Sequence, residues 1–308
     1  MPFPGPKPSM RILISGASGM IGSALARAVY AESWEVVRLV RTPAADGPDA
    51  ILWNPADVSS AVDPARIEGF DIVVHLSGAN VAHRWTPEFK REIVSSRVDS
   101  TQSLCSALAR VRNRPRVLLC ASGSGIYGNR GDEILTEESA PGAGFLADLC
   151  RTWEEATRPA SDAGLRVVLL RCGIVLDPAS GALAAMLPPF RFGVGGWLGS
   201  GCQWMPWIVL DDAVRAILFL AARDDLAGPF NVGSPQPVRN RGFARALAHA
   251  LRRPALFPMP RFVLRLGFAE FADEALLASQ RMVPKRLIDA GFELEHPEIQ
   301  TALKALLR

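Results

Sequence analysis

Three glycines near the start of the chain, Gly16, Gly19 and Gly22, have the spacing G-x-x-G-x-x-G. An apolar run over residues 11–15 precedes them, and residues 23–30 have a helical composition. In such a pattern the first glycine allows a tight turn, the second lets the backbone approach a pyrophosphate, and the third lets the helix pack closely. The helix start adds free N–H groups and a positive dipole end. We therefore predict a dinucleotide site, the alternative being a tight turn without a ligand. Its predicted contacts are Gly16, Ala17, Ser18, Gly19, Met20, Ile21 and Gly22.

The second predicted strand, residues 35–40, ends where NAD-binding sites carry an acidic residue for the ribose 2′-hydroxyl. This chain has Val40 followed by Arg41 there, and Arg38 lies two residues before Val40. A guanidinium pairs with a 2′-phosphate, which a carboxylate would repel. The sequence therefore favours NADP(H) as the cofactor, with Arg41 on the 2′-phosphate. The alternative is that Arg41 is an ordinary solvated arginine at a strand end.

Small residues follow two later predicted strands, at 71–76 and 115–120. The first of these strands ends in Leu76, Ser77 and Gly78, where small side chains would let the cofactor pass close to the backbone. A glycine-rich loop, residues 121–131, follows the other. Because the carboxyl ends of parallel strands meet at one edge of a sheet, substrate chemistry is expected at this loop.

Two hydroxyls in that loop, Tyr127 and Ser122, are the candidates for catalysis. The only other tyrosine, Tyr30, lies in the first helix. Tyr127 could act as an acid or base if Arg97 or Arg130 supplied a positive charge, since the unperturbed pKa of a tyrosine is about 10. Alternatively, Tyr127 packs the loop. Ser122 could bind a substrate carbonyl or hydroxyl, or it could cap a turn.

Three further side chains are predicted on the substrate side: Arg97, Arg171 and Trp204. Arg171 leaves a strand predicted over 165–170, where a substrate anion contact and a structural ion pair are both open. Trp204 and Trp207 either line the pocket or belong to the core.

The cysteines and histidines do not form a recognisable metal or disulfide site. The five cysteines show no C-x-x-C spacing, and the histidines do not cluster as metal ligands would. We expect reduced, mostly buried thiols in a cytoplasmic protein; Cys150 and Cys172 lie near the expected cleft, but no base is evident. His75 is expected to be a core histidine.

Strands and helical segments alternate along the chain, which predicts an α/β fold: a Rossmann-type doubly wound parallel sheet with a smaller, mainly helical C-terminal lobe. We predict a disordered, proline-rich lead-in over 1–9 and a dinucleotide-binding domain over 10–175, to which 202–233 return. The smaller, substrate-side lobe comprises 176–201 and 234–308. Single long helices are expected over 87–109, 145–161 and 262–279, a helix capped by Asp211 and Asp212 over 213–222, and irregular chain over 42–64 and 176–201.

The composition excludes several classes of function. The net charge is +3 over 308 residues, and no basic block suggests nucleic acid. No apolar run reaches the length of a membrane span. The expected partner is a small-molecule substrate, and nothing in the sequence indicates an oligomeric state.

Several short motifs, in this order and spacing, resemble the extended short-chain dehydrogenase/reductase superfamily, and within it an atypical epimerase-family branch. These motifs are Gly16–Gly22, the Ser-Gly-Ile-Tyr-Gly run ending at Gly128, Gln203–Ile208, Gly228–Val232, and Gln280–Leu287 with Ala290–Phe292, which are similar to a C-terminal domain of unknown function. The resemblance covers nearly the whole chain from Met10. It implies an NADP-type cofactor across the glycine turn, with Arg41 on the 2′-phosphate and Leu76, Ser77 and Gly78 beside it.

The catalytic residues of that superfamily do not carry over. Active members use a Tyr-x-x-x-Lys pair and a serine or threonine after the fourth strand. Here Phe145 and Leu149 take the tyrosine and lysine positions, and Gly123 takes the serine position.

Two functions of different classes therefore stand. The first is an NADP(H)-dependent oxidoreductase or epimerase-like enzyme acting on a small hydroxyl or carbonyl compound, for which the family label suggests a sugar nucleotide. The second is an NADP(H)-binding sensor or structural protein without hydride chemistry.

Overall fold

A seven-stranded, fully parallel sheet forms the centre of the computed structural model, which describes residues 10–43, 46–57 and 61–308. The predicted lead-in over 1–9 lies outside the described residues. In spatial order the strands are β11 (Gly228–Val232), β7 (Arg166–Cys172), β5 (Val117–Gly123), β4 (Ile72–His75), β1 (Arg11–Ser15), β2 (Glu35–Val40) and β3 (Ala50–Leu52). Chain order thus reverses between β1 and β4, the switch point at which doubly wound folds bind ligands. The predicted fold class is confirmed.

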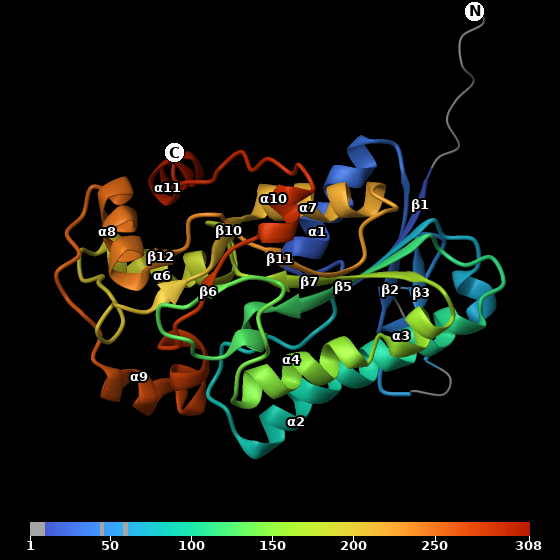
Figure 1. Cartoon of the computed structure of the whole chain (residues 1–308), viewed down its shortest axis with the longest axis horizontal. Coiled ribbons are helices and arrows are strands. Elements are labelled where there is room, and N and C mark those ends of the chain that lie inside the picture. The colour runs from blue at the N-terminus through green and yellow to red at the C-terminus, as the bar shows by residue number, and fades with distance from the viewer. Residues whose placement is uncertain (1–9, 44–45, 58–60) are drawn as a thin grey trace, which may run out of the picture.

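Helices cover both faces of this sheet (Figure 1). One face carries α1 (Met20–Ala31), α7 (Leu210–Ala222) and α10 (Lys285–Asp289). The other carries α3 (Val98–Arg110), α4 (Phe145–Glu155) and α5 (Arg158–Asp162), and α2 (Pro87–Ser95) packs against this helical layer rather than on the sheet. Successive side chains of β1 explain the two layers: Ile12 and Ile14 pack with α1 and α7, whereas Leu13 packs with α3. All three side chains are fully buried, as a central parallel strand requires.

The remaining elements form a lobe beside the carboxyl ends of the strands. Its helices are α6 (Gly181–Arg191), α8 (Asn240–Leu251), α9 (Arg261–Phe268) and α11 (Ile299–Leu306), with a π-helical turn at Ala272–Leu276. Its short strand pairs are β8 (Ile174–Leu176) with β10 (Trp207–Val209), β9 (Trp204–Met205) with β12 (Val238–Arg239), and β6 (Ile134–Leu135) with β13 (Arg281–Met282). Within α10, Leu287 instead packs on the main sheet core. The exact domain division stays a prediction.

Three helices that we expected to be continuous are broken. The predicted helix 87–109 stops at Ser95 and restarts at Val98, because Arg97 has φ −111° and ψ −61°. The helix predicted over 145–161 ends at Glu155, and α5 begins at Arg158, with Pro159 in its first turn, where the missing N–H costs nothing. The third, 262–279, divides at Ala269 between α9 and the π-helical turn.

Two segments expected to be irregular contain regular structure. Within 176–201, α6 forms despite Pro188 and Pro189, because Leu183, Leu187 and Phe190 bury one face of it at helical spacing. Within 42–64, the strand β3 pairs with β2.

Asp211 and Asp212 were wrongly expected to be helix caps. The residue before α7 is Val209, so both aspartates lie in the first turn. The Asp212 carboxylate instead accepts hydrogen bonds from the backbone N–H groups of Glu295 and His296, both at 2.9 Å.

Among the described residues, no helix is long and apolar enough to cross a membrane, and no three His, Cys, Asp or Glu side chains cluster as metal ligands would.

Candidate functional site

The turn after β1 has the geometry that a phosphate-binding glycine loop needs. Gly16 has φ +71°, and a Cβ there would lie 2.7 Å from the carbonyl carbon of Leu76, so only glycine fits. At Gly22 a Cβ would overlap the Gly16 carbonyl oxygen. A Cβ at Gly19 would meet only that oxygen, at 3.3 Å, and would otherwise point into open space. The space above Gly19 is therefore free for a ligand that approaches the backbone.

The N-terminus of α1 follows directly and is chemically suited to an anion. Gly19 is its N-cap residue, so no side chain caps the first N–H groups, and the first turn contains no acidic residue. The unpaired N–H groups and the positive end of the helix dipole therefore remain available to phosphate oxygens. Ser18 and Gly19 are exposed.

Arg41 lies at the carboxyl end of β2, beside a hollow of about 590 Å³. Trp53 and Arg66 line the same hollow, but Arg66 is engaged by Asp46 at 2.8 Å. With the residues that the structure describes, Arg41 makes no hydrogen bond or ion pair. Its charge is thus available to a group that enters the hollow.

Leu76, Ser77 and Gly78 leave β4 next to the glycine turn. The backbone N–H of Leu76 is held by the backbone oxygen and the hydroxyl of Ser15, both at 3.2 Å. A Cβ at Gly78 would lie 3.1 Å from Cζ of Arg97, so Gly78 also makes room for a guanidinium. We call residues 16–22, 41 and 76–78 the cofactor edge.

A buried chain of hydrogen bonds lies beneath that edge. Ser15 Oγ lies 2.6 Å from His75 Nδ1, and His75 Nε2 lies 3.0 Å from Thr101 Oγ1, which also accepts a bond from Trp153 Nε1 at 2.8 Å. Burial lowers the pKa of His75 from 6.5 to about 4, so the ring is neutral at physiological pH. The prediction of a core histidine is confirmed. The chain ties β1 and β4 to α3 and α4.

The two candidate catalytic hydroxyls lie together but are both engaged. Tyr127 is fully buried; its hydroxyl donates to Asn231 Oδ1 at 2.6 Å and accepts from Arg171 Nη1 at 3.1 Å. Ser122 Oγ donates to Glu154 Oε1 at 2.7 Å. Burial raises the pKa of Tyr127 despite the charge of Arg171. A catalytic role for either hydroxyl stays a prediction, and it would require one of these bonds to break.

Arg171 forms the ion pair that we left open against a substrate contact. Its Nε and Nη2 atoms donate to the two Glu154 oxygens at 2.8 and 2.9 Å, and the two side chains are 9% and 12% exposed. Burial alone would lower the pKa of Arg171, but Glu154 outweighs burial and raises it. The charge beside Tyr127 therefore comes from Arg171. We considered Arg97 and Arg130 as possible sources of this charge; the structure places Arg171 there instead, and Arg130 pairs with Glu133 at 2.6 Å.

Phe145 and Leu149, which we align with a tyrosine and a lysine, belong to an apolar cluster. The Phe145 ring lies 5.0 Å from that of Trp85, and Leu149 packs in the same cluster. Lys90, which sequence reasoning missed, places its ammonium 4.2 Å from the centre of the Phe145 ring and pairs with Glu270 at 2.8 Å.

Glu274 is a second residue that the sequence did not reveal. Its carboxylate accepts from the backbone N–H of Leu146 at 3.1 Å and so caps α4. This cap comes from more than a hundred residues along the chain. No local pattern predicts such a contact. We call residues 122–127, 145–150, 154 and 171 the substrate edge.

Trp204 and Trp207 do not join this group. The Trp204 indole donates to Asp132 at 2.7 Å, with Arg239 and Arg281 over its ring, and Trp207 is fully buried. Burial raises the pKa of the Cys150 and Cys172 thiols to about 12, so neither is a thiolate near neutral pH.

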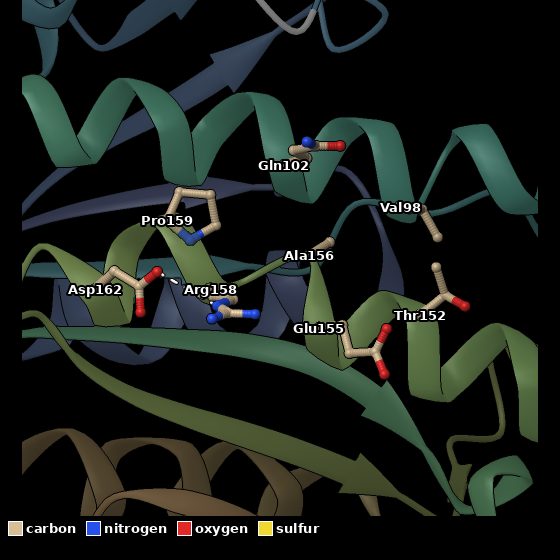
Figure 2. A pocket seen from close by; sticks show the side chains of 8 residues that line it. All are labelled: Val98, Gln102, Thr152, Glu155, Ala156, Arg158, Pro159 and Asp162. Atoms are coloured by element: carbon tan, nitrogen blue, oxygen red, sulfur yellow. Dashed lines mark ion pairs between the residues drawn. The ribbon is translucent and has the colours of Figure 1, made fainter.

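A second hollow, of about 520 Å³, lies between α3 and the α4–α5 segment (Figure 2). Figure 2 shows Arg158 turned toward Asp162, with which it pairs at 3.4 Å. None of its lining residues is a predicted site residue.

Comparison with known proteins identifies the family to which this chain is similar. Residues 12–233 match the family described as NAD dependent epimerase/dehydratase, and residues 259–306 match a domain of unknown function. An "epimerase family protein" of Mycobacterium bovis is 44% identical over 293 residues, covering 95% of this chain and 96% of that protein. The human epimerase family protein SDR39U1 is 32% identical over 306 residues, covering 97% and 100%.

Solved structures of similar proteins have the same fold. The crystal structure of human SDR39U1 with NADPH has a TM-score of 0.89 at 31% identity, covering 97% of this chain and 99% of that one. A nucleoside-diphosphate sugar epimerase from Corynebacterium glutamicum has a TM-score of 0.80 at 32% identity, covering 97% of this chain and 58% of that one. The structure of MoeE5 with UDP-glucuronic acid and NAD, at 22% identity and a TM-score of 0.74, shares the fold.

Proposed function

The chain belongs to the NAD dependent epimerase/dehydratase family, and we propose that it binds NADP(H) and acts as an oxidoreductase or epimerase on a small hydroxyl or carbonyl compound. The glycine turn at the switch point carries this proposal: its open Gly19 and uncapped helix start fit a pyrophosphate. NADP(H), when bound, would supply hydride transfer.

The preference for NADP(H) over NAD(H) rests on Arg41. Its guanidinium is unpaired by the described residues and borders a hollow at the ends of β2 and β3, where a 2′-phosphate would lie. A guanidinium binds a phosphate through two parallel hydrogen bonds. The NADPH present in the structure of human SDR39U1 supports this assignment.

The substrate edge supports binding more directly than it supports proton transfer. Phe145 and Leu149 cannot exchange a proton, and the Tyr127 and Ser122 hydroxyls are bound to neighbouring side chains. Of the two, Ser122 is better suited to touch a substrate, because it is bound by a single partner. A substrate oxygen could accept a hydrogen bond from the Ser122 hydroxyl if that hydroxyl gave up its bond to Glu154.

The lack of a free proton donor also supports a second, non-catalytic function. Because Phe145 and Leu149, the residues that we align with the catalytic tyrosine and lysine, lie in an apolar cluster, the chain also fits an NADP(H)-binding sensor or structural protein without hydride chemistry. This function would keep the cofactor edge and need no proton donor.

Screening for turnover of the cofactor or of the offered compound decides between the two functions. The purified protein is supplied with NADPH or with NADP⁺ and offered a panel of carbonyl compounds and sugar nucleotides. Absorbance at the reduced nicotinamide band reports net oxidation or reduction, and analysis of the recovered sugar nucleotides reports epimerisation, which leaves the cofactor unchanged overall. The enzyme proposal expects turnover with at least one compound. Tight NADPH binding without turnover across the panel would favour the sensor, and failure to bind NADPH would contradict both.

A further inference from the structure

Two arginines lie beside the strand ends, and their surroundings differ. Arg171 is matched by Glu154, which accepts two hydrogen bonds from its guanidinium. Arg97, the residue before α3, has no such partner: no carboxylate in the described part of the chain lies within ion-pair distance of it. Burial lowers the pKa of Arg97, yet a guanidinium stays protonated in proteins. A positive charge is thus held in the protein without an internal counter-ion.

The contacts of Arg97 orient its side chain but use only some of its N–H donors. Nη2 donates to the Ala79 carbonyl at 2.9 Å, and Nη1 donates to the Ile93 carbonyl at 3.4 Å and lies 3.5 Å from Ser96 Oγ. The guanidinium carbon lies 5.2 Å from the centre of the Trp153 ring. These neutral contacts fix a direction but do not neutralise the charge.

Free N–H groups remain on this guanidinium. An arginine has five N–H donors, and among the described residues no acceptor faces the Nε–H of Arg97. Arg166 Nε is the only fully buried side-chain nitrogen or oxygen of those residues without a partner. The Nε–H of Arg97 therefore faces a space that solvent can reach.

The position of Arg97 connects it to both edges of the site. Its Cζ lies 3.1 Å from the Cβ position of Gly78, at the end of β4. Cys150 lies close enough for Arg97 to influence its thiol, and Cys150 Sγ lies 3.8 and 3.6 Å from the Cβ positions of Gly123 and Gly125. Arg97 therefore lies between the ends of β4 and β5, next to the switch point.

We propose that Arg97 is an anion-binding residue of this site, whose ligand is an oxyanion of the bound small molecules: a carboxylate or phosphate of the substrate, or the pyrophosphate of the cofactor. The inference rests on the proposed function and adds a charge requirement to it. An oxyanion would accept the free N–H groups and supply the missing counter-charge, as guanidinium–oxyanion pairs do.

Arg97→Met tests this assignment, with Arg91→Met as the matched control. Arg91 carries the same charge on α2, but its side chain is 75% exposed and pairs with Glu88. Binding of NADPH to each protein is measured by calorimetry. Inorganic phosphate and oxalate are then titrated into the free protein and into the NADPH complex.

Two results would support the proposal and identify the source of the anion. If the cofactor supplies it, Arg97→Met weakens NADPH binding by about tenfold or more, whereas Arg91→Met does not. If the substrate supplies it, NADPH binding is unchanged, but the NADPH complex loses by a similar factor its affinity for oxalate or phosphate.

Thermal unfolding separates ligand binding from a structural role. Removing a charge that the protein itself does not compensate should leave the midpoint unchanged or higher. A lower midpoint with unchanged affinities for all three probes would overturn the proposal, as would wild-type protein that binds NADPH but shows no effect of Arg97→Met on any probe. If the wild-type protein fails to bind NADPH, the proposed function fails, and Arg97 is then judged on phosphate and oxalate binding to the free protein.

Discussion

The cofactor edge and the substrate edge lie on the same side of one sheet but use their polar groups in opposite ways. At the cofactor edge, the first N–H groups of α1 are uncapped and Arg41 has no described partner. At the substrate edge, Tyr127 and Ser122 are bound to other side chains. The cofactor edge thus has polar groups free to bind a ligand, whereas the candidate hydroxyls of the substrate edge are already hydrogen-bonded within the protein.

This difference shows what each edge contributes to the protein. Backbone N–H groups next to open space are satisfied by water in the absence of a ligand and add little to the stability of the fold. Buried and fully paired side chains instead stabilise the fold. The substrate edge should therefore respond to mutation mainly through stability, and the cofactor edge mainly through affinity.

The largest effect is expected from breaking the ion pair of the substrate edge. Glu154→Gln leaves the buried Arg171 guanidinium without a counter-charge, which typically costs about 3–5 kcal/mol. Denaturant unfolding measures this loss, with Glu155→Gln on the same helix as the control. A change below about 1 kcal/mol would mean that solvent compensates this pair as it does surface pairs.

The buried histidine beneath the cofactor edge, His75, should make stability depend on pH. The pKa of His75 falls from 6.5 to about 4 on folding, so below pH 6.5 the unfolded chain binds a proton that the folded chain does not. The free energy of unfolding should fall as the pH drops from 6.5 towards 4, by on the order of 3 kcal/mol, and should not depend on His75 above that range.

Unfolding curves of the wild-type protein and of His75→Gln between pH 4 and 7 test this. The variant should show a smaller slope than the wild-type protein. Equal slopes for the wild type and His75→Gln would show that the ring is not held neutral.

A side chain at the open glycine should act on affinity alone. Gly19 has φ −75°, which any residue can adopt, so Gly19→Val should fold but intrude on the pyrophosphate. We expect NADPH affinity to fall by about 100-fold or more, or ~2.7 kcal/mol. Gly242→Val, at a helical glycine whose Cβ would meet no atom within 4 Å, is the control. Unchanged affinity would mean that the glycine loop is only a turn.

The smallest of these effects is expected at Tyr127. Tyr127→Phe removes a buried hydroxyl and leaves Asn231 Oδ1 without its donor, which should cost about 1–3 kcal/mol of stability and leave NADPH affinity unchanged. Unfolding and titration measure the two quantities. A fall in turnover of ~10²–10⁴-fold at unchanged stability would instead identify Tyr127 as a proton donor.

The sequence predicted the geometry of the glycine turn better than the contacts of the substrate edge, for a physical reason. The glycine turn is local: Gly16, Gly19 and Gly22 lie within one strand–turn–helix unit, and their spacing sets their geometry. The partners of Tyr127 are distant in sequence, since Asn231 lies 104 residues and Arg171 44 residues away. No local pattern could indicate that both would meet one hydroxyl.

The predicted boundaries of helices and strands were wrong where tertiary packing overrides local composition. The helix α6 contains Pro188 and Pro189, which argue against a helix, yet its buried face stabilises it. Similarly, Asp212 follows a predicted strand, as a capping residue would, but its carboxylate accepts hydrogen bonds from the backbone N–H groups of Glu295 and His296. Such contacts depend on the assembled fold.

The central claim is that the cofactor edge binds NADP(H), and comparing NADPH with NADH tests it most directly. Arg41 should add charge-assisted hydrogen bonds to the 2′-phosphate, which contribute about 1.5–3 kcal/mol. Fluorescence titration should therefore show tighter binding of NADPH by about tenfold or more, and Arg41→Ala should abolish the preference by weakening NADPH alone. Equal affinities in the wild-type protein, or a preference that survives Arg41→Ala, would contradict the account.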